Sequence, residues 1–81
     1  MEHLLYLPRI SRQAEHCKLI EWRREEGDHL TAGEPLLLYE TQKASSVLEV
    51  PVTGTLKQII IASGEWLDVA DPVGIITIKQ Q

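Results

Sequence analysis

The sequence has few aromatic or sulfur-containing side chains, and this shortage excludes several classes of protein. Among 81 residues there are two Trp, two Tyr, one Met, one Cys and no Phe. A net charge of −4 and so few rings provide neither the basic field nor the stacking platform of a nucleic-acid-binding domain. The one cysteine, Cys17, cannot form an internal disulfide, which is typical of a reducing compartment.

Long apolar runs are also missing. No stretch approaches the roughly 20 apolar residues that a membrane helix needs, and the opening MEHLLYLPRI lacks the basic segment and cleavage site of a secretory leader. Hydrophobic residues make up 43% and charged residues 25% of the chain, as in ordinary globular proteins. We expect one monomeric domain over residues 1–81, with a thin core within residues 3–79 and no membrane association.

Short runs of Leu, Ile and Val recur between turn signals, and no window keeps a helical apolar period for long. This pattern predicts an all-β domain, with turns about ten residues apart, as in a small sandwich or barrel. Turn signals surround Gly27, Gly33, Gly54 and Gly64. The expected strands are residues 3–7, 17–24, 36–41, 47–51, 55–61 and 73–79.

An internal repeat is the most informative feature. A shift of 37 residues lays GDHLTAGEPL, residues 27–36, over GEWLDVADPV, residues 64–73, without a gap, and six of the ten pairs are identical or similar. Two copies of one small unit can share a core by packing face to face about a quasi-twofold axis. The repeat therefore predicts a flattened two-layer β structure with internal symmetry.

The repeat also predicts the place of Lys43, which lies in a turn signal between two expected strands. The same shift carries Lys43 to position 80, so the chain ends replace its hairpin in the second copy. We expect Lys43 at one end of the molecule, exposed, and both termini at the other. A lysine in water is protonated at neutral pH, so we expect Lys43 to be modified by another enzyme rather than to act as a nucleophile.

The residues around Lys43 carry a family resemblance. ETQKA, residues 40–44, followed by an apolar strand and VPVTGTLKQI, residues 50–59, resembles the lipoyl domains of 2-oxo acid dehydrogenase complexes, found in their acyltransferase component. The usual motif of that family is ETDKA, and the resemblance extends over residues 4–78. It implies a flattened barrel or sandwich of two antiparallel sheets with about four strands each. It also implies lipoic acid on Lys43, with flanking recognition residues Glu40, Thr41, Gln42 and Ala44.

The resemblance implies carriage of groups, with no catalysis by the domain itself. A lipoate ligase or lipoyltransferase would attach the cofactor. A thiamin-dependent 2-oxo acid dehydrogenase component would then load it, an acyltransferase core would take the acyl group, and dihydrolipoamide dehydrogenase would reoxidise it. The implied location is the cytoplasm, or the mitochondrial matrix in a eukaryote.

The chain departs from the family pattern at two positions. Gln42 replaces the usual Asp before the lysine, which removes a charge, and Cys17 stands where the first half normally has Gly. The backbone at Cys17 is accordingly expected to turn less tightly. The segment 8–16 matches the family only in position, and its Arg9, Arg12 and Glu15 are expected to tune the choice of dehydrogenase.

Two other functions stay open. A biotinyl carrier domain of a carboxylase resembles the same fold, but its lysine usually lies between methionines, whereas the neighbours here are Gln42 and Ala44. An unmodified sandwich that acts as an interaction module is the third reading.

Several other residues are expected to be structural. His16 and Cys17 are adjacent on an expected strand and so face opposite ways, and the acidic turn at 25–28 lacks the ligand spacing of a calcium loop. We expect no metal site. Trp22 is expected to pack on the core and Trp66 to lie on an exposed edge.

Overall fold

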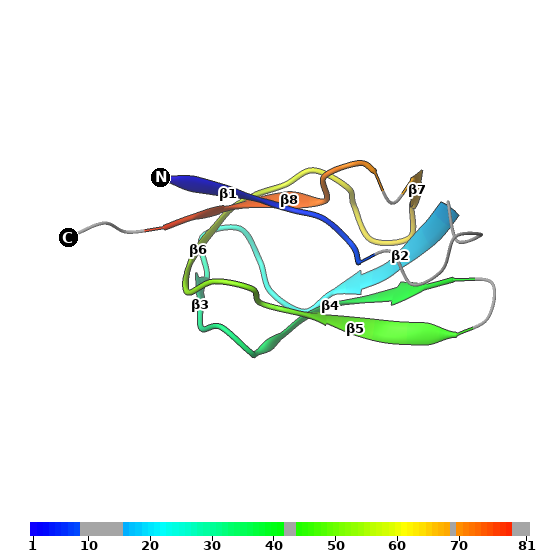
Figure 1. Cartoon of the computed structure of the whole chain (residues 1–81), viewed down its shortest axis with the longest axis horizontal. Coiled ribbons are helices and arrows are strands. Elements are labelled where there is room, and N and C mark those ends of the chain that lie inside the picture. Colours follow the sequence, from blue (N-terminus) through cyan, green and yellow to red (C-terminus); the bar gives the residue numbers. More distant parts are fainter. Residues whose placement is uncertain (9–15, 42–43, 69, 79–81) are drawn as a thin grey trace.

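The computed structural model describes residues 1–8, 16–41, 44–68 and 70–78 of the chain. These residues form two four-stranded sheets in which every pairing is antiparallel (Figure 1). One sheet has the order β1-β8-β6-β3 and the other the order β5-β4-β2-β7. The strands are β1 (Glu2–Leu5), β2 (His16–Trp22), β3 (His29–Leu30), β4 (Pro35–Glu40), β5 (Ser45–Glu49), β6 (Gly54–Ile59), β7 (Trp66–Asp68) and β8 (Gly74–Thr77). The all-β prediction of two four-stranded sheets is therefore confirmed.

The sequence repeat relates the two sheets, and each sheet takes one short strand, β3 or β7, from the other copy. The shift of 37 residues carries β2 onto β6, β3 onto β7 and β4 onto β8, and these replacements convert one strand order into the other. The remaining place beside β8, equivalent to that of β5 beside β4, is filled by β1 from the start of the chain. The predicted quasi-twofold symmetry is thus present in the strand topology.

The symmetry extends to individual residue pairs. Leu19 lies opposite Tyr39 in β2 and β4, and the same shift gives Leu56 opposite Ile76 in β6 and β8. Both pairings then slip by one residue, between Leu19 and Glu21 and between Leu56 and Gln58. A β-bulge bends its strand and increases the local twist. The same bulge in both sheets therefore lets each short sheet curve around the core.

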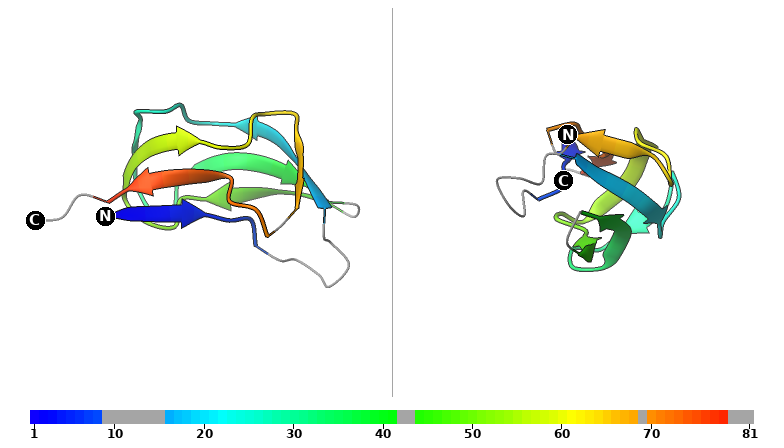
Figure 2. Two further views of the ribbon diagram at one scale, coloured as in Figure 1. Left: turned by 90° about the horizontal axis from the view of Figure 1, so that it is seen from above. Right: turned by 90° about the vertical axis from the view of Figure 1, so that its right-hand side faces the viewer.

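Figure 2 shows the strands of the two sheets from above and from one end, and both sheets contribute residues to one core cluster. Alternation along the strands directs one side of each sheet inward. The fully buried leucines include Leu19 and Leu36 from one sheet and Leu5 and Leu56 from the other. No buried residue in the described part of the chain is polar or charged, so the two sheets pack against each other through apolar side chains.

Two strands were not predicted. β3 has two residues and β7 has three, which is too short for any alternation of apolar and polar residues to appear in the sequence. The six predicted strands all exist, with boundaries that differ by one or two residues. Among the described residues the structure has no helix long and apolar enough to cross a membrane.

The predicted glycine turns are partly confirmed. Gly27, Gly33 and Gly64 have φ of 96°, 95° and 89°, in the region that glycine tolerates best. Gly54 is different, because it is the first residue of β6 and has no positive φ. A Cβ at Gly54 would lie 2.3 Å from the backbone oxygen of Thr77. The expectation that Gly54 serves a turn is therefore wrong: glycine is needed there for close approach of two strands.

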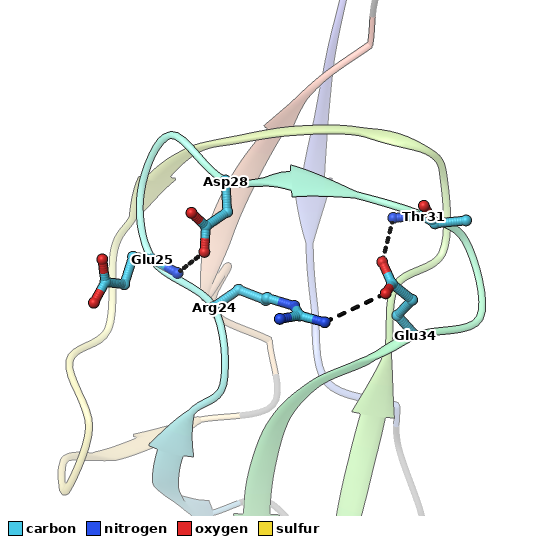
Figure 3. A network of polar contacts seen from close by, with 5 residues as sticks. All are labelled: Arg24, Glu25, Asp28, Thr31 and Glu34. Carbon is cyan, nitrogen blue, oxygen red and sulfur yellow. Dashed lines mark hydrogen bonds and ion pairs between the residues drawn. The ribbon is translucent and has the colours of Figure 1, made fainter.

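Polar contacts hold the connections around β3 (Figure 3). The carboxylate of Asp28 accepts a hydrogen bond from the Glu25 N–H at 2.9 Å, and that of Glu34 accepts one from the Thr31 N–H at 2.8 Å. Arg24 pairs with Glu34 at 3.3 Å. The second copy repeats the first of these contacts, since Glu65 accepts from the Ala62 N–H at 3.1 Å. The same carboxylate-to-backbone contact thus stabilises the equivalent turn in both copies of the repeat.

Candidate functional site

The residues that flank the lysine motif form the end of a β-hairpin. Strand β4 stops at Glu40 and β5 starts at Ser45, and these two residues lie opposite each other. The Thr41 N–H donates to the Ala44 carbonyl at 2.8 Å, and the Thr41 hydroxyl lies 3.1 Å from the same oxygen and 3.3 Å from the Ala44 nitrogen. The chain is therefore tightly closed between Thr41 and Ala44. The residues between them, Gln42 and Lys43, lie outside the described residues, so the predicted exposure of Lys43 stays a prediction.

The hairpin and the chain start lie at opposite ends of the molecule. Figure 1 shows β4 and β5 meeting at one end, while Met1 begins at the other beside β8. Ile78, the last described residue, donates its N–H to the Met1 carbonyl at 2.7 Å. Ala44 and Ser45 are exposed. The arrangement predicted from the repeat thus holds for the described residues on both sides of Lys43.

Glu40 lies on the outer face of its sheet. It is exposed, whereas the preceding residue, Tyr39, is 3% exposed and belongs to the core. Lys18 lies opposite Glu40 on β2 and Ser45 lies opposite it on β5. Within the described part of the chain, the Glu40 carboxylate has no hydrogen-bond or ion-pair partner. This motif residue is thus available to another molecule.

Cys17, the second departure from the family motif, is structural. It lies in β2 and is 1% exposed, and burial raises the pKa of its thiol, with a further contribution from the nearby Asp68 carboxylate. A neutral, buried thiol is a poor nucleophile. The backbone at Cys17 belongs to a regular strand and pairs with Leu67. The prediction of a less tight turn at Cys17 is therefore wrong, because no turn occurs there.

The residues proposed to tune partner choice, Arg9, Arg12 and Glu15, lie outside the described residues. For His16 only the backbone is described, as the first residue of β2.

The acidic turn after β2 serves the fold. Glu26 accepts a hydrogen bond from the Ile59 N–H at 2.8 Å, and Asp28 accepts one from the Glu25 N–H at 2.9 Å. Glu26 thereby links the two copies. Among the described residues, no group of three or more His, Cys, Asp or Glu side chains is placed to hold a metal ion.

The two tryptophans differ as predicted. Trp22 packs against the core and donates its Nε1–H to the Ile61 carbonyl at 2.7 Å. Trp66 lies on the edge strand β7, is 68% exposed, and has the Lys18 Nζ 5.9 Å from its ring centroid. The pairing of Lys18 with Trp66 and Glu40 was not predicted, because only the registers of β2 with β7 and β4 bring these residues together.

An open groove of about 580 Å³ lies where the two copies meet. Its lining includes Trp22 and Ile59, which are equivalent in the repeat, and Glu26 and Ser63, which are also equivalent. These pairs hydrogen-bond across the symmetry axis, Ile59 to Glu26 and Trp22 to Ser63. The groove is thus a product of the symmetry and lies apart from the hairpin motif.

Comparisons with known proteins agree with the fold and with the family resemblance. The biotin/lipoyl family model, described as that of biotin-requiring enzymes, matches residues 3–76. The chain is 38% identical over 58 residues to the dihydrolipoyllysine-residue acetyltransferase component of the mitochondrial pyruvate dehydrogenase complex of Caenorhabditis elegans, covering 72% of this chain and 11% of that protein. It is 28% identical over 72 residues to the chloroplastic acetyltransferase component 4 of the pyruvate dehydrogenase complex of Arabidopsis thaliana, covering 89% and 15%. The chain thus spans less than a fifth of either relative.

A solved structure shares the fold. A single-chain, multi-domain long-chain acyl-CoA carboxylase superposes with a TM-score of 0.79 over 99% of this chain and 7% of the other, at 21% identity. The same β architecture therefore occurs within a carboxylase and in this chain.

Proposed function

Because the chain belongs to the biotin/lipoyl family, we propose that it is a lipoyl carrier domain and that Lys43 is its attachment site. The observation that supports this most is the hairpin closed between Thr41 and Ala44 at the end opposite Met1. Lys43 is the only lysine of the motif ETQKA, and its covalent neighbour Ala44 is exposed. The described residues therefore fit a covalent arm, since they leave the hairpin end open to an approaching enzyme.

The chain itself would position and present the arm. The paired strands β4 and β5 form the two stems of the hairpin, and the Thr41–Ala44 contacts join them directly after Glu40. When bound, a lipoyl group would supply a dithiolane that accepts acyl groups and electrons. Tethering to Lys43 would keep that group at high local concentration near successive active sites. Amide formation would also remove the charge of the lysine.

The relatives favour lipoate over biotin. Two of them are named as dihydrolipoyllysine-residue acetyltransferase components, and the residues beside Lys43, Gln42 and Ala44, are not the methionines usual in biotinyl domains. A biotinyl carrier of a carboxylase is the second candidate, and the family description and the shared carboxylase fold are what favour it.

The lipoyl assignment carries a set of partners with it. These are a thiamin-dependent 2-oxo acid dehydrogenase component, an acyltransferase core, dihydrolipoamide dehydrogenase, and a lipoate ligase or lipoyltransferase. The complex would work in the cytoplasm, or in the mitochondrial matrix of a eukaryote.

Enzymatic attachment tests this function. The purified chain is incubated with a lipoate ligase, lipoate and ATP, and in parallel with a biotin ligase, biotin and ATP, and its intact mass is measured. We expect the mass of one lipoyl group to be added, and none for Lys43→Arg. Lys57→Arg, which keeps the cation that pairs with Glu2, is the control and should be modified like the original chain. A gain with biotin alone would favour the second candidate, and no gain with either ligase would contradict both.

A further inference from the structure

Three charged or aromatic residues form a line across the outer face of the sheet that holds the hairpin. Lys18 lies opposite Trp66 on one side and opposite Glu40 on the other. Their neighbours Cys17, Tyr39 and Leu67 are buried, so alternation turns all three side chains of the line outward. We call Trp66, Lys18 and Glu40 the outer row. It begins on the edge strand β7 and reaches the hairpin, where Ser45 continues it.

The symmetry of the fold supplies an internal comparison. The equivalent row in the other sheet consists of His29, Thr55 and Thr77, with the same register. That row has the same backbone but neither a large exposed ring nor a pair of opposite charges. The architecture therefore does not require Trp, Lys and Glu at these places, and the outer row is distinctive of the hairpin end.

The outer row is also unused by the fold. Trp66 is 68% exposed, although burying an indole would stabilise the protein. Lys18 and Glu40 lie opposite each other without an ion pair within the described residues. The Lys18 ammonium lies instead 5.9 Å from the Trp66 ring centroid, a contact that is weak at an exposed site. The aromatic group and the Glu40 carboxylate are thus left for a partner.

We propose that the outer row is a docking surface for the enzyme that attaches the cofactor to Lys43, an inference that rests on the proposed function. Such an enzyme must recognise the unmodified chain, so its binding free energy has to come from the polypeptide alone. Enzymes that act later can also hold the cofactor. The row is continuous with the hairpin through Glu40, which is followed directly by Thr41. An enzyme that reaches Lys43 from the outer face of this sheet would cover the row.

The row defines the chemistry of that enzyme's surface. Glu40 requires a cationic side chain opposite it, and Trp66 requires an apolar hollow, with an acidic group beside it to meet Lys18. Exposed tryptophans that become buried on binding are among the residues that contribute most to protein interfaces. Charges at the rim mainly guide encounter and orientation. Trp66 should therefore dominate affinity.

Steady-state attachment kinetics test the proposal. The rate of lipoylation by a lipoate ligase, at saturating lipoate and ATP, is measured by intact mass as a function of chain concentration. For Trp66→Ala we expect KM for the chain to rise about tenfold or more with kcat unchanged. Trp66→Phe should recover part of this loss. The matched control is His29→Ala, the equivalent position in the other sheet, which should leave both constants unchanged. Unfolding curves of the three variants show whether each keeps the fold.

The outcomes separate this inference from the function on which it rests. If the original chain is lipoylated and Trp66→Ala has the same KM as His29→Ala, the docking surface is refuted and the carrier function stands. A fall in kcat without a change in KM would likewise refute it, because docking acts on binding. If the original chain gains no mass with either ligase, the proposed function and this inference fail together.

Discussion

Cys17 and Gly54 occupy equivalent positions in the two sheets, opposite Leu67 and Leu30, but only Cys17 carries a side chain. At Gly54 a Cβ would lie 2.3 Å from the Thr77 oxygen. Because Cys17 does have a Cβ, β2 and β4 must leave more room at that point than β6 and β8 do. The two halves thus share a register while they differ in local spacing.

Gly54→Ala is expected to destabilise the protein by about 3 kcal/mol, because the added methyl group meets backbone at 2.3 Å and the Ile76 Cγ2 at 2.8 Å. Cys17→Ala removes only a sulfur from the equivalent place and should cost about 1 kcal/mol. Urea unfolding followed by tryptophan fluorescence measures both. Equal losses of unfolding free energy for the two variants would contradict this prediction, because they would show that β6 and β8 move apart easily at Gly54.

Gly27→Ala and Gly64→Ala should each lower the free energy of unfolding by about 1 kcal/mol or somewhat more, and the two losses should be similar. Their φ angles are 96° and 89°, and an added Cβ would meet nothing within 4 Å at either site. The loss therefore comes from backbone conformation alone. The same unfolding assay applies. A clear difference between the two would contradict the equivalence of the turns.

The stability of the chain should fall in alkaline solution, and Cys17 should be one cause. Burial raises the pKa of its thiol above the ordinary value in the folded state. The stabilisation is therefore complete below the ordinary thiol pKa of about 8.5 and is lost as pH rises through the folded pKa. The free energy of unfolding is measured from pH 7 upwards for the original chain and for Cys17→Ala. Identical pH slopes for the two proteins would exclude this contribution.

Trp22→Phe is expected to cost about 1 to 2 kcal/mol, since it leaves the Ile61 carbonyl without the 2.7 Å hydrogen bond from Nε1. Trp66→Phe is the matched change on an exposed edge and should alter stability by less than about 0.5 kcal/mol. Thermal unfolding by far-UV circular dichroism compares them without relying on tryptophan emission. A larger loss for Trp66→Phe would contradict the division between a packed and an exposed ring.

Much of the fold could be predicted because a sequence repeat implies that the folded chain has internal symmetry. Once residues 27–36 match 64–73, strands found in one half imply their equivalents in the other. The strands β3 and β7 were missed because two or three residues show no periodicity, and only backbone pairing to β6 and β2 reveals them. The role of Gly54 was misjudged for a related reason, since a glycine that permits a turn and one that permits close contact look alike in a sequence.

The sequence predicted the motif of the candidate site and the end of the molecule where it lies, but it did not predict which residues surround it. The segment ETQKA predicts Lys43 and Glu40 as site residues, and the repeat correctly separated the strands on either side of this segment from Met1. No linear pattern joined Glu40 to Lys18 and Trp66, because these residues become neighbours only through the registers of β2 with β4 and β7. The choice between lipoate and biotin depends on what an enzyme recognises, which strand geometry alone does not encode.

The place of β1 has a consequence for biosynthesis. Leu5, in the first strand of the domain, has its partner at Gly74, and β2 needs β7, with Cys17 opposite Leu67. Neither sheet can be completed until the strands β7 and β8 have left the ribosome. This domain should therefore stay protease-sensitive while residues 1–66 emerge and become resistant in one step once β8 is free to pair.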